Sequence, residues 1–150
     1  MMKIILPDNS SRELPEGSSG YDLAKDIGPG LAKSAVAITV DGVQKDLHDE
    51  INTDSSVSII TIDSDEGLEI MRHTLTAQVL ARAIKNLYPK SKLAIGPTIE
   101  DGFYYDVESE EVISSDDLNK IEEEMKKIIK SKSSITKKLV SRSQAIKVFK

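Results

Sequence analysis

Few side chains in this 150-residue sequence could carry chemistry. It has two histidines, His48 and His73, and no cysteine, so thiolate chemistry and a thiolate zinc site are excluded and we expect no metal site. His48 lies in a polar stretch and gets no role. His73 is followed five residues later by Gln78, and side chains with this spacing point about 140° apart on an α-helix. Glutamine can position a water molecule but cannot act as a base, so the two residues do not make a catalytic pair.

The charge of the chain is unevenly distributed. Residues 1–62 carry five Lys or Arg against ten Asp or Glu, while residues 63–150 carry fifteen of each, giving the net charge of −5. This net charge argues against a general nucleic-acid binder. Nothing acidic follows Glu124, and the basic side chains beyond it are Lys126, Lys127, Lys130, Lys132, Lys137, Lys138, Arg142, Lys147 and Lys150. This basic stretch is either a solvated helix face or a surface that meets phosphates.

The first 62 residues have the pattern of short strands around one helix. Ser19 and Asp22 have the spacing of a capping box, and Asp41-Gly42 is a strong hairpin signal. In chain order we expect a hairpin of residues 3–6 and a strand ending near Leu14, and then a helix that stops at 28–30. A strand at 35–40 that turns at 41–42 and a strand at 57–62 should follow. This order fits a ubiquitin-like β-grasp fold.

The polar residues 63–67 indicate a domain boundary, and a second α+β unit follows. Apolar residues recur every three or four positions from Leu68 to Leu87, which predicts one long helix that ends before Pro89. After it we expect a hairpin of 92–95 and 103–107 around a turn at 101–102, a helix from Ser114, a strand at 134–140, and a helix that begins with the capping box of Ser141 and Gln144.

The final helix has a start signal and an apolar face but no stop signal before Lys150. A helix this short is marginal unless it packs against something. We therefore expect the chain to be truncated within a larger protein, with a natural end at Lys150 as the alternative.

Three motifs in the second unit resemble those of one family. They are Arg72-His73-Thr74, Ala83-Ile84-Lys85-Asn86-Leu87-Tyr88-Pro89, and the most specific, Ile95-Gly96-Pro97-Thr98-Ile99-Glu100-Asp101-Gly102-Phe103-Tyr104-Tyr105-Asp106. Together they resemble bacterial threonyl-tRNA synthetases. The first 62 residues look like the TGS domain of that family, so the resemblance covers essentially the whole chain.

The resemblance implies a TGS domain at 1–62 and the truncated start of an editing domain at 63–150. The parent protein would ligate threonine to tRNA-Thr with ATP. Its ATP and zinc sites, its anticodon-binding domain and the surfaces of its homodimer are expected outside this chain, which itself would hold no cofactor. No apolar run in the sequence approaches the roughly 18 residues that a membrane span needs, and its start has too short an apolar stretch for a secretory signal, so we expect a cytoplasmic protein with no membrane segment.

The departure from the family concerns the editing chemistry. The family presents two histidines four residues apart, whereas here residues 74–78 contain one extra residue and Gln78 takes the place of the second histidine. The degenerate editing positions are therefore His73 and Gln78, and Tyr104 resembles a pocket-lining position, with core packing as its alternative. We expect residues 1–150 to be inactive. The alternative functions are a free-standing TGS-containing binding or regulatory module and a trans-editing hydrolase. The missing histidine pair counts against the hydrolase.

Overall fold

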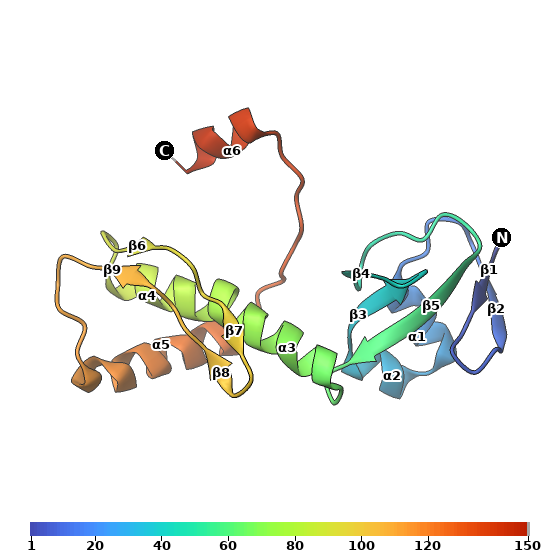
Figure 1. The fold of residues 1–150 in the computed structure, drawn as a ribbon, viewed down its shortest axis with the longest axis horizontal. Coiled ribbons are helices and arrows are strands. Elements are labelled where there is room, and N and C mark those ends of the chain that lie inside the picture. The colour runs from blue at the N-terminus through green and yellow to red at the C-terminus, as the bar shows by residue number, and fades with distance from the viewer. Residues whose placement is uncertain (150) are drawn as a thin grey trace.

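The computed structural model describes residues 1–149, which form two lobes joined by a central helix (Figure 1). We call residues 1–62 the N-terminal lobe and residues 65–130 the second lobe. The remaining residues 131–149 form a tail that ends in a short helix apart from both lobes. No helix within residues 1–149 has the length and apolarity needed to cross a membrane.

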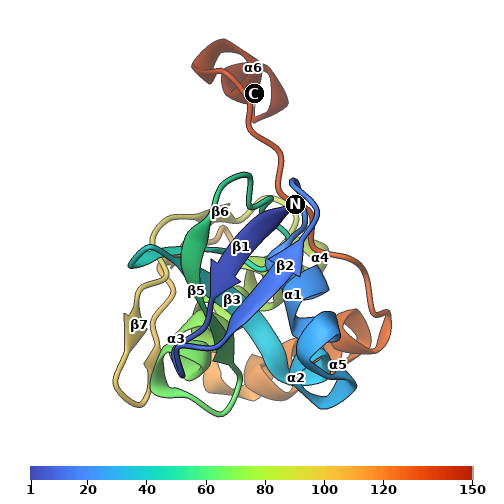
Figure 2. The same ribbon diagram turned by 90° about the vertical axis from the view of Figure 1, so that its right-hand side faces the viewer.

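The N-terminal lobe is a five-stranded mixed sheet with two helices on one face. Its sheet has the order β2-β1-β5-β3-β4, in which β1 and β5 are parallel and the other neighbours antiparallel (Figure 2). The elements are β1 (Met2–Ile5), β2 (Ser11–Leu14), α1 (Gly20–Ile27), α2 (Pro29–Ser34), β3 (Ala35–Val40), β4 (Val43–Asp46) and β5 (Ser55–Thr61). The predicted ubiquitin-like β-grasp within an α+β chain is confirmed.

The core of this lobe follows from strand alternation. Ile38 pairs with Ile59, and Val40 pairs with Val57, so these side chains share the sheet face that α1 covers. Gly20, at the start of α1, lies so close to Ile38 that a Cβ there would collide with it. The predicted capping box starts the helix, because Ser19 Oγ accepts from Asp22 N–H and Asp22 accepts from Ser19 N–H.

Residues 28–30 end one helix and also begin another. We expected a plain stop there, and α1 does end at Gly28. However, α2 begins at Pro29, where the fixed φ of proline suits the first helical position and its missing N–H costs nothing.

The junction between the lobes is short and packed. Helix α3 (Asp65–Thr74) begins inside the polar stretch that we expected to be a linker. Ser64 Oγ accepts from Gly67 N–H at 3.0 Å and donates to the Thr61 carbonyl at 2.8 Å. A side chain at position 67 would collide with that carbonyl, so glycine lets α3 start directly against the end of β5.

The predicted long helix is continuous but not uniform. It consists of α3, a π-helical segment η1 (Leu75–Leu80), and α4 (Ala81–Leu87). The Ala81 N–H donates to the Thr76 carbonyl five residues back, whereas an α-helix bonds four residues back. The wide turn therefore lies in the stretch where one extra residue was inferred from the sequence.

The rest of the second lobe is a bent hairpin and one helix. Strand β6 (Lys92–Leu93) pairs with β9 (Val107–Glu108), and β7 (Thr98–Ile99) pairs with β8 (Gly102–Phe103), with Gly96-Pro97 breaking the first arm between its two strands. The turn expected at 101–102 lies one residue earlier, at Glu100-Asp101, because Gly102 pairs with Ile99 as the first residue of β8. The 3-10 turn η2 (Ser115–Asp117) then leads into α5 (Leu118–Lys130). Ile84, Tyr88 and Ile121 form the small core between α4 and α5.

The expectation for residues 134–140 was wrong, because they form no strand. A strand needs a partner edge, and this exposed segment runs away from both short ladders of the hairpin (Figure 1). The expected final helix is present as α6 (Arg142–Val148), with the capping box of Ser141 and Gln144. Lys150, the last residue of the predicted basic stretch, lies outside the described residues.

Candidate functional site

A groove runs between the sheet of the N-terminal lobe, α3 and the hairpin. We call it the interdomain groove; it has a volume of about 560 Å³. The sheet contributes hydroxyl and amide groups, α3 contributes carboxylates and an imidazole, and the hairpin contributes one hydroxyl. The polar residues that line it are Thr39, Gln44, Ser58, Ser64, Glu66, Glu69, His73, Thr74 and Thr98. Because no Lys or Arg lines it, the groove favours neutral or cationic groups.

His73 lies in the last turn of α3 and is exposed to this groove. Its neighbours in the lining are Ile70 and Thr74 on the same helix and Thr98 of β7. The structure therefore places the only histidine of the second lobe beside the N-terminal lobe, with Glu69 as the nearest acidic residue along the lining side of the helix.

The hairpin is fastened to the central helix at two points. Arg72 Nη1 donates to the Glu100 carbonyl at 2.5 Å, which holds the hairpin tip against α3. Further along, Thr76 is 1% exposed, and its methyl group packs on Gly96. A Cβ at Gly96 would lie 2.6 Å from both Thr76 Cγ2 and Tyr105 Cδ2, so glycine is required for this close approach.

Gln78 lines a different groove. We call it the basic groove; it has a volume of about 370 Å³ between the central helix and the end of α5. Its cations are Arg82 and Lys132, its hydroxyls belong to Ser133, Ser134 and Thr136, and its walls include Val79 and Ile128. The interdomain and basic grooves share no lining residue, so His73 and Gln78 are not brought together.

The two cations of the basic groove lie beside a partly neutralised helix face. Among the described residues, neither Arg82 nor Lys132 makes an ion pair, while Lys126 pairs with Glu122 and Lys127 with Glu124. The Asn86 amide donates to Glu124, and this hydrogen bond, more than Lys127 or Arg82, lowers the pKa of the Glu124 carboxyl. Glu124 therefore stays ionised and offsets part of the local positive charge.

The two tyrosines of the hairpin face in opposite directions. Tyr104 is 61% exposed, and its backbone N–H donates to the Pro97 carbonyl. Tyr105, the next residue, turns inward against Gly96 and Thr76. The sequence analysis singled out Tyr104 and overlooked Tyr105, although strand alternation requires adjacent residues to face opposite sides. His48, to which no role was given, lies against the Tyr21 ring with the ring centres 5.4 Å apart.

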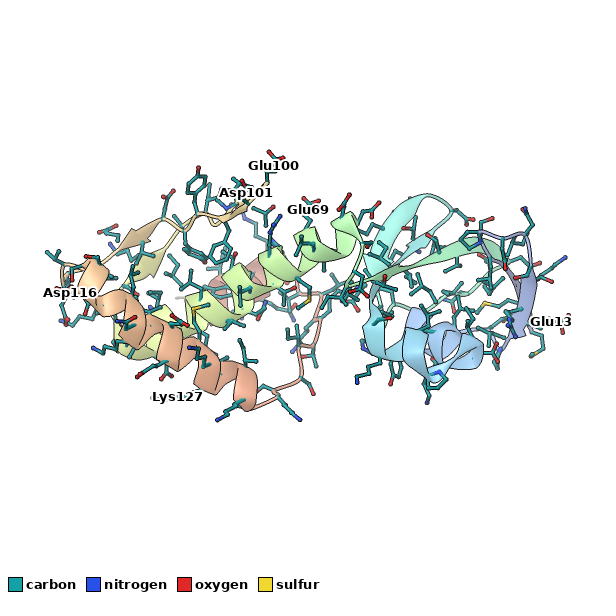
Figure 3. The ribbon with its side chains drawn as sticks, turned by 90° about the horizontal axis from the view of Figure 1, so that it is seen from below. Glu13, Glu69, Glu100, Asp101, Asp116 and Lys127 are labelled. Atoms are coloured by element: carbon teal, nitrogen blue, oxygen red, sulfur yellow. The ribbon has the colours of Figure 1, made fainter. Side chains whose placement is uncertain are left out.

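The acidic side chains of the hairpin tip lie on the opposite side of the central helix from α5, which itself carries both acidic and basic residues (Figure 3). Figure 3 shows Glu69 on α3 and Glu100 and Asp101 at the hairpin tip on one side of that helix, and Lys127 on the other. Within residues 1–149 no three His, Asp or Glu side chains lie close enough to hold a metal ion. The sites can therefore bind polar groups and phosphates, but neither groove presents paired acid and base groups with an imidazole at their centre.

Comparisons with known proteins agree with these features. Residues 2–61 match the TGS domain family. The chain is 48% identical over 145 residues to threonine–tRNA ligase 1 of Bacillus subtilis, covering 97% of this chain and 22% of that protein. It is 49% identical over 150 residues to the threonine–tRNA ligase of Desulfatibacillum aliphaticivorans, covering 100% of this chain and 23% of that protein.

The similarity extends well beyond the TGS domain. The threonine–tRNA ligase of Geobacillus sp. is 46% identical over 149 residues, 99% of this chain. The chain thus spans less than a quarter of the length of each of these relatives, and they support the synthetase interpretation rather than a free-standing TGS module. Over nearly its whole length the chain is therefore similar to threonine–tRNA ligases, and its residues 2–61 match the TGS domain family.

Proposed function

We propose that this chain is the N-terminal part of a protein that ligates threonine to tRNA-Thr at the expense of ATP. The observation that carries the proposal is the 46–49% identity to threonine–tRNA ligases across 97–100% of the chain, lobes and hairpin motif included. In this proposal the ATP and zinc sites and the homodimer contacts belong to parts of the protein outside residues 1–150, and the protein works in the cytoplasm.

The ligase proposal is tested on the protein encoded by the whole reading frame that contains this sequence. That protein should catalyse threonine-dependent exchange of pyrophosphate into ATP, because amino-acid activation precedes transfer to tRNA. The chain of residues 1–150 serves as the matched control and should give only background exchange. A whole protein that activates no amino acid, or activates one other than threonine, would overturn the proposal.

Residues 63–150 are, in this proposal, the start of an editing domain that does not hydrolyse ester bonds by itself. A water molecule attacking an aminoacyl ester needs a base beside it, and among the described residues no hydrogen bond joins the His73 imidazole to another polar side chain that would orient it. His73 and Gln78 line separate grooves, and Gln78 cannot take up a proton. Tyr104 is mostly exposed and points away from the packed side of the hairpin.

Deacylation of seryl-tRNA carrying the threonine anticodon tests this inactivity. Residues 1–150 should release serine no faster than buffer, and His73→Ala should match the unchanged chain. Release above background that His73→Ala abolishes would contradict the proposal and restore the hydrolase alternative.

The chain meets tRNA, in this proposal, at the basic groove. Arg82 and Lys132 make no ion pair among the described residues, although Glu124 offsets part of their charge, and three hydroxyls and the Gln78 amide around them can donate to phosphate oxygens. Residues 63–150 are neutral overall, whereas the N-terminal lobe carries −5 and repels RNA, so the attraction is local and weak.

Fluorescence anisotropy with a labelled tRNA acceptor-arm hairpin at low salt tests this surface. Replacing Arg82 and Lys132 by Gln should weaken binding and reduce the slope of log K against log salt by about 1.8, because each lost phosphate contact contributes about 0.9. The matched control replaces Lys33 and Lys45 by Gln, which removes the same charge from the N-terminal lobe. Equal effects of the two variants would mean that RNA binding depends only on the net charge of the chain, which would contradict a binding surface at the basic groove.

A further inference from the structure

The π-helical segment η1 lies in the middle of one long helix, and the two ends of that helix pack against different elements. Upstream of it, Gly67 abuts β5 and Arg72 holds the hairpin tip. Downstream of it, Ile84 and Tyr88 pack on Ile121 of α5. Both ends are therefore fixed in rotation by contacts that they make with other elements.

An extra residue in a continuous α-helix would break this arrangement. Each residue adds about 100° of rotation and about 1.5 Å of rise, so an insertion turns everything after it by that amount. Ile84 and Tyr88 would then leave the α5 core, or Arg72 would leave the Glu100 carbonyl. A single π turn takes up one residue in a wider ring and keeps the two ends in their original register.

Thr76 shows how the wide turn is held. Its Oγ1 donates to the Arg72 carbonyl at 2.8 Å, which supplies a donor where the regular backbone ladder is interrupted. Its methyl group fills the space beside Gly96 and the Tyr105 ring. Thr76 thus joins the π turn to the hairpin, while the next residue, Ala77, is small and exposed.

We propose that η1 is a one-residue insertion stored as a π turn, that it preserves the rotational register between the two lobes, and that Thr76 is the residue that positions it. The wide turn also sets which groove each polar side chain reaches, since it begins two residues after His73, in the interdomain groove, and contains Gln78, in the basic groove. The proposal concerns residues 65–88 of this chain alone and does not depend on the ligase activity.

Two single-residue deletions test it in the full 150-residue chain. Deleting Ala77 removes the surplus residue, so the helix should become α-helical throughout and the midpoint of thermal unfolding should stay within about 3 °C or rise. Deleting Glu69, which is also exposed but lies in regular α3, should rotate the helix start against its neighbours and lower that midpoint by about 10 °C. Equal loss in both variants would overturn the proposal.

A second measurement reads the register directly and does not depend on stability. Gln78→His combined with deletion of Ala77 places two imidazoles four residues apart on one α-helical face, where they can chelate Zn²⁺ together. Gln78→His alone leaves them in separate grooves across the π turn. Titration with Zn²⁺ followed by calorimetry should give at least tenfold tighter binding for the deletion variant. Equal affinities would show that the deletion had not restored a regular helix.

Two substitutions at Thr76 separate the role of its hydroxyl from that of its methyl group. Thr76→Val keeps the methyl contact with Gly96 but removes the hydroxyl, and it should speed amide hydrogen exchange across residues 76–81 while leaving that of α5 unchanged. Thr76→Ser keeps the hydroxyl and should preserve protection in the turn. A Thr76→Val variant with unchanged exchange would remove Thr76 from the proposal.

Discussion

The two lobes are similar in size but differ in how they bury apolar surface. The N-terminal lobe encloses nine buried apolar residues between one sheet face and α1, whereas α4 and α5 of the second lobe bury Ile84, Tyr88 and Ile121. Large apolar side chains such as Val112 and Leu118 are exposed in the second lobe. Since burial of apolar surface is the main stabilising term, the N-terminal lobe should be the more stable unit.

The largest expected effect breaks the core of the N-terminal lobe. Ile38→Ala removes a fully buried side chain that packs under α1 and should cost about 3 kcal/mol of unfolding free energy. Urea denaturation followed by circular dichroism measures it. Val43→Ala on the exposed edge strand β4 is the control and should change little. Similar losses in both variants would mean that this lobe has no specific core.

A smaller effect is expected from the same kind of change in the second lobe. Ile121→Ala should cost about 2 kcal/mol, at the low end for such a truncation, because the surrounding core is small and can relax. Hydrogen exchange should quicken in α4 and α5 and stay unchanged in β3 and β5. Ile129→Ala, on the exposed side of α5, should leave exchange unaltered. Faster exchange in β3 would contradict the independence of the lobes.

Helix caps sharpen the comparison, because the same motif occurs in packed and unpacked helices. Ser19→Ala should destabilise the N-terminal lobe by about 1 kcal/mol, whereas Ser141→Ala, in the isolated helix α6, should leave both lobes unchanged. The Ser19 hydroxyl, followed by its backbone N–H, lowers the pKa of Asp22. This contribution is present above the ordinary carboxyl pKa and is lost as the pH falls through the lowered value. The difference in stability between the unchanged chain and Ser19→Ala should therefore shrink in acid to what the cap from Ser19 Oγ to the Asp22 N–H contributes.

The smallest effect concerns the contact between the tail and the N-terminal lobe. The Lys137 ammonium group pairs with Asp49 and, chiefly by hydrogen bonding, lowers the pKa of that carboxyl. Lys137→Gln should return the pKa toward its ordinary value, as carbon-13 NMR of the Asp49 carboxyl can record, with a stability loss of less than about 1 kcal/mol. The loss should appear above the ordinary pKa and vanish in acid. Lys138→Gln, one residue further on, should leave Asp49 unchanged.

Local signals predicted most of the elements. The capping boxes of Ser19, Ser114 and Ser141 all begin helices, and the Asp41-Gly42 turn joins β3 to β4 with φ of 49° and 81° at these two residues. The signals failed where the outcome depends on distant partners. Residues 134–140 have strand-like composition but no neighbouring edge, and Pro29 begins a helix where it was expected to confirm a stop.

The candidate site was less predictable than the fold. The sequence identified His73, Gln78 and Tyr104 as the positions to examine, and the extra residue in 74–78 as the departure from the family. It assumed a regular α-helix between His73 and Gln78, and the π turn replaces that geometry. It also could not distinguish Tyr104 from Tyr105, because which of these two adjacent residues between β8 and β9 faces inward depends on the approach of Gly96 to Thr76.

The sequence by itself determined the resemblance to threonyl-tRNA synthetases, the β-grasp order of the first 62 residues and the absence of a second histidine in the helix. These are properties of residue identity, short spacing and local capping, which act within a few positions of the chain. Only the tertiary structure decided how the inserted residue is absorbed and which groove each polar side chain lines. Those outcomes follow from packing at both ends of one helix, since contacts with β5, the hairpin and α5 fix its rotation in ways that no local pattern records.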